Sequence, residues 1–113
     1  MLSSTNRLTT ADEFRHAVRR GRRLGGSLMV VHLVVPNVDK ATSEPARAGF
    51  VVAKSVGPAV TRNRVKRRLR HLVRERISSL PGGSTLVVRA LPGSANATAR
   101  DLGAELDRCL GRV

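Results

Sequence analysis

A dense run of cationic side chains between Thr61 and Arg76 is the segment best suited to binding an anionic ligand. It holds eight Lys or Arg side chains and a single acidic one, Glu75. A solvated helix face mixes charge signs, because like charges at i,i+4 spacing destabilise a helix. Cations near a helix N-terminus are disfavoured further by the macrodipole. An arrangement this unfavourable by itself indicates an external polyanion, and nucleic acid is the first candidate.

Helical geometry sorts this run into two faces. At about 100° per residue, the apolar side chains share one face: Val65, Leu69, Leu72, Val73, Ile77 and Leu80. The adjacent face carries Asn63, Lys66, Arg67, Arg70 and Arg74, and Arg64 and Arg68 lie further round, away from the core. We predict a helix from Thr61 to about Leu80 whose apolar face packs on the sheet and whose cationic face is exposed to a ligand. Asn63 either caps the helix start or contacts a base, a sugar hydroxyl or a hydrated metal ion.

The composition of the whole chain supports an anionic partner. The 113 residues carry 21 Lys and Arg against 8 Asp and Glu, a formal net charge of +13, and 41% are hydrophobic. This is enough apolar material for one domain over residues 1–113. The excess of arginine over lysine fits phosphate binding, and a G- and C-rich genome would produce it equally well.

Membrane and secretory classes are disfavoured. The longest apolar run, Leu28 to Val35, is far short of the roughly 20 residues that span a bilayer, and the first residues lack the apolar stretch of a secretory signal. We expect a cytoplasmic protein without a membrane partner. The single cysteine, Cys109, excludes an intrachain disulfide.

Flanking elements must position the cationic helix. Thr10 and Glu13 form a capping-box pattern for a helix over residues 8–20. Leu28 to Val35 and Arg47 to Ala53 predict two strands, and we expect them to pair antiparallel across a polar loop. Residues 84–90 predict another strand, and residues 95–111 a closing solvated helix with balanced charges. The order helix, strands, long helix, strand, helix predicts an α+β fold.

No catalytic constellation stands out. His16, His32 and His71 fall on different elements, and no carboxylate pair has acid–base spacing. We therefore expect no catalytic residue and no metal site in the protein. With two Phe and neither Trp nor Tyr, the chain lacks the stacking platforms of the RRM and OB classes. The long helix could enter a DNA major groove, but no other helix precedes it at the spacing of a helix-turn-helix motif.

One stretch resembles a known family. Gly49 to Arg70, with Arg62-Asn63-Arg64-Val65-Lys66-Arg67 opening the long helix, resembles the signature of the bacterial ribonuclease P protein subunit. The start, Asn6-Arg7-Leu8 followed by Phe14, is also similar to that family. The resemblance implies a ribosomal-S5-domain-2-like α/β sandwich with a left-handed crossover through the long helix, against the usual hand.

The resemblance also implies a function. Such a subunit is the non-catalytic part of a ribonucleoprotein endoribonuclease. It binds the catalytic RNA and the 5′ leader of precursor tRNA, and it assists removal of the leader to give the mature tRNA 5′ end. Mg²⁺ is bound mainly by the RNA subunit. By position, the implied RNA-contacting residues are Lys54, Arg62, Asn63, Arg64, Lys66, Arg67, Arg68 and Arg70.

The leader cleft is expected between the first helix and the sheet. The residues assigned to it are Arg7, Phe14, Val18, Met29, His32 and Phe50. Val18 stands where the family often has an aromatic residue, and His32 or Met29 replaces a strand aromatic, so less base stacking is expected. The alternative functions are a ribosomal or general RNA-binding protein of the same fold without a role in tRNA processing, and a DNA-binding regulator.

Overall fold

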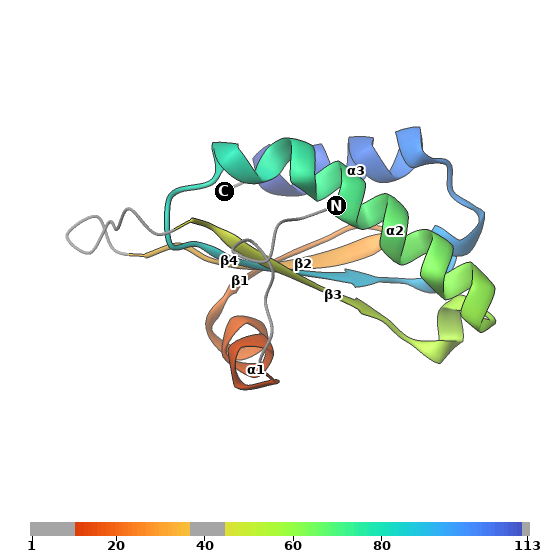
Figure 1. The fold of residues 1–113 in the computed structure, drawn as a ribbon, viewed down its shortest axis with the longest axis horizontal. Coiled ribbons are helices and arrows are strands. Elements are labelled where there is room, and N and C mark those ends of the chain that lie inside the picture. Colours follow the sequence, from red (N-terminus) through yellow and green to blue (C-terminus); the bar gives the residue numbers. More distant parts are fainter. Residues whose placement is uncertain (1–10, 37–44, 112–113) are drawn as a thin grey trace.

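A mixed four-stranded sheet separates two helical layers in the computed structural model, which describes residues 11–36 and 45–111 (Figure 1). Helix α1 (Ala11–Arg20) covers one face of the sheet. Helices α2 (Ala59–Arg76) and α3 (Ala99–Gly111) cover the other. The predicted α+β class is confirmed. None of the helices in these ranges is long and apolar enough to cross a membrane.

The sheet contains β1 (Arg22–Gly25), β2 (Met29–Val34), β3 (Arg47–Val52) and β4 (Thr85–Ala90), in the order β1-β2-β4-β3. β2 runs antiparallel to β1 and β4, and β3 runs parallel to β4. The expected direct pairing of β2 with β3 is wrong, because β4 lies between them. The crossover from β3 through α2 to β4 is left-handed (Figure 1).

Strand alternation divides the apolar side chains between the two faces. Met29, Val31 and Leu33 of β2 point into the main core on the α2 and α3 side, with Leu86 and Val88 of β4. The four apolar residues of α2 predicted to face the protein complete this core, and all are buried: Val65, Leu69, Leu72 and Val73. A smaller cluster of Ala17 and Val87, with Phe14 and Val34 against it, joins α1 to the opposite face.

Several boundaries differ from expectation. α2 begins at Ala59, and its last predicted turn is the 3-10 helix η4 (Ile77–Ser79). Two further 3-10 helices, η3 (Lys54–Val56) and η5 (Pro92–Asn96), were not predicted, and η5 includes the start of the expected closing helix. β1 was missed because two arginines in a four-residue segment give no strand signal, and only its pairing with β2 makes it a strand. The proposed cap, Thr10, lies outside the described residues.

The closing helix is anchored by a buried carboxylate. Glu105 is 3% exposed. Its oxygens accept hydrogen bonds from the backbone N–H groups of Ser27 (3.0 Å), Leu28 (2.7 Å) and Met29 (2.8 Å). A Cβ at Gly26 would overlap this carboxylate. The expectation of an ordinary solvated helix is therefore wrong for this face of α3, which holds the β1–β2 turn.

Candidate nucleic-acid interface

The solvent side of α2 gathers three of the four cations predicted for this face around one hollow, and Arg74 does not line it. Asn63, Lys66, Arg67, Arg70 and His71 line a surface depression of about 340 Å³. Within the described ranges, Lys66, Arg67 and Arg70 form no ion pair with a carboxylate. Their charges therefore remain available to an anionic ligand, as the helical spacing predicted.

Asn63 is exposed in the second turn of α2. The helix begins at Ala59 and its N-cap position is Pro58, which makes no side-chain capping bond. The capping explanation for Asn63 is wrong, because the residue lies too far into the helix. Its amide is left facing the same hollow as Lys66 and Arg67.

Arg64 and Arg68 already have partners within the protein. Arg64 Nη2 donates to the carbonyl oxygen of Ala95 (3.0 Å), and Arg68 Nη1 donates to that of Ala97 (3.1 Å). Both are partly buried, so the expectation that they point away from the body of the protein is corrected. A guanidinium has five N–H donors, so each can still donate to a phosphate while it anchors α2 to the η5 segment.

Lys54 and Arg62 extend the cationic surface to the start of α2. Lys54 is exposed and opens η3, which contacts α2 and η5. Arg62 is partly buried, and its Nε has no hydrogen-bond partner. At the other end of α2, Arg76 is bound to Asp107 of α3 through Nε (2.6 Å). The hydrogen bond to Asp107 raises the pKa of Arg76 and lowers that of Asp107.

A cleft does lie between α1 and the sheet. It has a volume of about 510 Å³, and its described lining is Val18, Arg23, Val30, His32, Arg89 and Leu91. Val18 and His32, which we expected between α1 and the sheet, both line this cleft. Arg23 and Arg89 were missed, because β1 was not recognised and the strand that carries Arg89 could not be assigned a neighbour. Register places Arg23 opposite His32, and Arg89 opposite Val30.

Other residues assigned to this cleft lie elsewhere. Met29 is fully buried in the core on the α2 side, and Phe50 packs against that same core. Both assignments are wrong, because these side chains alternate onto the opposite face of the sheet from His32. Phe14 lies on the α1 side but packs against Ala17 and Val87 rather than lining the cavity. Arg7 lies outside the described residues.

His32 combines burial with unused hydrogen-bonding capacity. It is 6% exposed, and its Nδ1 has no hydrogen-bond partner. Burial, followed by the charges of Arg23 and Arg89, lowers the pKa of the imidazole. A neutral ring can donate at one nitrogen and accept at the other. The cleft therefore offers two cations for phosphate, one hydrogen-bonding ring and an apolar wall.

A cationic helix on one side of the sheet and a cationic cleft on the other define an α+β protein of the nucleic-acid-binding class. A family model described as Ribonuclease P matches residues 2–113. The chain is 58% identical over 113 residues to the ribonuclease P protein component of a Nocardioides species, covering 100% of this chain and 95% of that protein. It is 56% identical over 119 residues to that of Streptomyces griseus, covering 98% and 97%.

Solved structures show the same fold. The RNase P protein of Staphylococcus aureus superposes with a TM-score of 0.79 at 22% identity, covering 95% of this chain and 94% of that one. That of Thermotoga maritima superposes with a TM-score of 0.77 at 24% identity, covering 95% and 96%. The chain belongs to the ribonuclease P protein family.

Proposed function

We propose that α2 binds the catalytic RNA of ribonuclease P while the cleft between α1 and the sheet binds the 5′ leader of precursor tRNA. The observation that carries this proposal is the placement of two cationic surfaces on opposite faces of one sheet. Lys66, Arg67 and Arg70 lie on one side, and Arg23 and Arg89 lie on the other. One protein can therefore hold two RNA segments at once.

The lining of the cleft suits a single strand. Arg23 and Arg89 would bind phosphates, since guanidinium groups form paired hydrogen bonds with phosphate oxygens. Val18, Val30 and Leu91 offer an apolar wall to a sugar or a base. Without a Phe, Tyr or Trp in the described lining, backbone contacts would dominate, and these carry little sequence information.

Hydrolysis of the leader is assigned to the RNA. In the described ranges, no three His, Cys, Asp or Glu side chains are grouped so that they could hold a metal ion. As the family resemblance implies, we place the Mg²⁺ mainly on the catalytic RNA. The role left for the protein is to position the leader and to neutralise phosphate repulsion between the two RNAs.

Reconstitution tests the whole proposal. The full chain is combined with a bacterial ribonuclease P RNA in moderate Mg²⁺, and release of the leader from precursor tRNA is followed. We expect the protein to increase the rate of cleavage. Absence of stimulation would contradict a role in tRNA processing and favour a general RNA-binding protein.

Neutralising the α2 hollow tests its assignment to the catalytic RNA. Arg67→Gln and Arg70→Gln each keep a good helix former and remove one charge. We expect weaker binding of the catalytic RNA, with the slope of log affinity against log salt reduced by about 0.9 per lost phosphate contact. Filter binding across a salt series measures both. Arg100→Gln, which removes one charge from an exposed position of α3, is the matched control, and equal behaviour of all three variants would overturn the assignment.

A further inference from the structure

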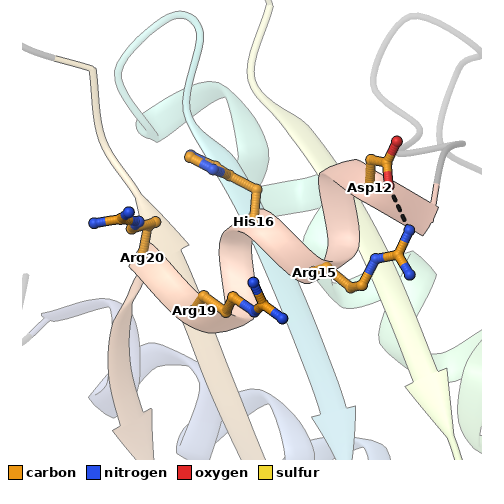
Figure 2. Close-up of a pocket in the computed structure, with 5 residues that line it drawn as sticks. All are labelled: Asp12, Arg15, His16, Arg19 and Arg20. Atoms are coloured by element: carbon orange, nitrogen blue, oxygen red, sulfur yellow. Dashed lines mark hydrogen bonds and ion pairs between the residues drawn. The ribbon is translucent and has the colours of Figure 1, made fainter.

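The outward face of α1 carries a second group of cations that the proposed function does not use. Asp12, Arg15, His16, Arg19 and Arg20 surround a hollow of about 470 Å³ on the solvent side of this helix (Figure 2). The opposite side of the helix packs on the sheet through Phe14 and Ala17. The arginine side chains therefore point away from the protein core.

Charge on this side of the sheet is poorly balanced within the described ranges. Two carboxylates lie there, and each has an arginine partner: Asp12 pairs with Arg15 and Glu13 with Arg47. Among residues 11–36 and 45–111, no carboxylate pairs with four further arginines, Arg19, Arg20, Arg23 and Arg89.

The helix dipole explains only part of this surplus. It favours cations in the last turn, where Arg19 and Arg20 lie, but gives no reason for Arg15 in the middle of α1. It does not account for Arg23 and Arg89, which lie on strands. The four arginines repel one another on one side of the sheet, and a bound polyanion would relieve that repulsion.

Helical geometry connects this face to the cleft. At about 100° per residue, Arg15 lies roughly 60° from Val18 around the helix, and Arg19 lies roughly 100° from it. Val18 lines the cleft with Arg23 and Arg89. Glu13 lies on the other edge of α1 and pairs with Arg47 of β3 at 2.5 Å. A strand leaving the cleft along the Val18 edge therefore meets Arg15 and Arg19 next.

We propose that the outward face of α1 extends the leader path and binds phosphates of the 5′-distal leader nucleotides, beyond those held in the cleft. This inference rests on the proposed function. The face offers mainly charge, with no Phe, Tyr or Trp in its lining, so the binding depends weakly on base sequence and strongly on salt. Contacts with this face make the affinity for precursor tRNA depend on the length of the leader.

The experiment uses the reconstituted holoenzyme and a series of precursor tRNAs whose leaders lengthen one nucleotide at a time. The test variant is Arg15→Gln with Arg19→Gln. The matched control is Arg100→Gln with Arg108→Gln, which removes the same charge from exposed positions of α3. Arg108 pairs with Glu105 at 3.5 Å, as Arg15 pairs with Asp12, so each double variant removes one paired arginine. With the wild-type chain, affinity rises with leader length and then levels off. With the test variant, affinity levels off at a shorter leader.

For long leaders we expect a loss on the order of tenfold, with the salt slope reduced by about 1.4 for two single-strand contacts. The shortest leaders and the control variant behave as wild type. Arg15→Lys with Arg19→Lys restores most of the affinity, because the charges are retained. Circular dichroism and a thermal melt establish that each variant is folded.

Two outcomes overturn the inference. If the length dependence is unchanged while affinity for the catalytic RNA alone falls, the phosphates bound by α1 belong to the catalytic RNA. If neither changes, the face binds no RNA. Failure of the proposed function is distinguishable, since the wild-type chain would then show no stimulation with any leader.

Discussion

At the scale of single residues, the arginines of α2 differ in what their guanidinium groups already contact. Arg64 and Arg68 donate to carbonyl groups at and just after η5, and Arg76 is paired with Asp107. Arg67 and Arg70 make no such contact in the described ranges and line the hollow. A substitution at Arg64 or Arg68 therefore removes a hydrogen bond within the protein as well as a charge, whereas one at Arg67 or Arg70 removes the charge without breaking such a bond.

His32 makes stability depend on pH. Its pKa is lowered below the ordinary 6.5 by burial first, and then by Arg23 and Arg89. Below pH 6.5 the unfolded chain binds a proton that the folded chain resists, so stability rises with pH through this range. We predict that the free energy of unfolding is highest above pH 6.5 and falls as the pH drops below it, and that His32→Gln reduces this fall.

Urea denaturation at a series of pH values measures the effect. His16→Gln is the matched control, because it makes the same substitution at a histidine that is exposed on α1. Identical pH profiles for His32→Gln and the wild-type chain would mean that the pKa of His32 is the same in the folded and the unfolded chain.

At the scale of elements, α3 and the β1–β2 turn are held together by one carboxylate. Removing the Glu105 side chain would leave the backbone N–H groups of Ser27, Leu28 and Met29 without this acceptor in a partly buried site. We predict that Glu105→Ala lowers the free energy of unfolding by about 3–5 kcal/mol, and Glu105→Gln by about 1–3 kcal/mol, since unsatisfied buried donors cost about 1–3 kcal/mol each.

Denaturant unfolding of the purified variants provides the values. Glu75→Gln, an exposed carboxylate on α2, should change stability by no more than about 0.5 kcal/mol. A Glu105→Ala chain as stable as that control would show that water replaces the carboxylate without cost.

At the scale of the whole molecule, cationic surfaces lie on both sides of a body measuring 42 × 26 × 25 Å. A formal net charge of +13 on 113 residues destabilises the compact state through self-repulsion. We predict that the free chain gains stability as NaCl rises from about 0.01 M to about 1 M, because the Debye length shortens from about 30 Å to about 3 Å.

Thermal melts across this range test the prediction. A variant combining Arg20→Gln, Arg67→Gln and Arg74→Gln carries three fewer charges at partly or fully exposed sites, so its melting temperature should depend less on salt. A steeper dependence in the variant would show that specific ion binding, rather than screening, governs stability.

The sequence by itself determined the elements whose pattern is local. The spacing of Val65, Leu69, Leu72 and Val73 identified the buried face of α2 and, beside it, the cationic face, because helical periodicity depends only on neighbouring residues. The apolar runs identified β2, β3 and β4. The Arg62-Asn63-Arg64 resemblance identified the family.

Only the tertiary structure decided which elements are neighbours. It inserted β4 between β2 and β3, made a strand of Arg22–Gly25, and placed His32 in the cleft while Met29 and Phe50 entered the opposite core. It also brought Arg23 and Arg89 to the same cleft, and the carbonyl groups of Ala95 and Ala97 to Arg64 and Arg68. These contacts join residues far apart in the chain, and strand order is set by the packing of the whole sheet rather than by local periodicity.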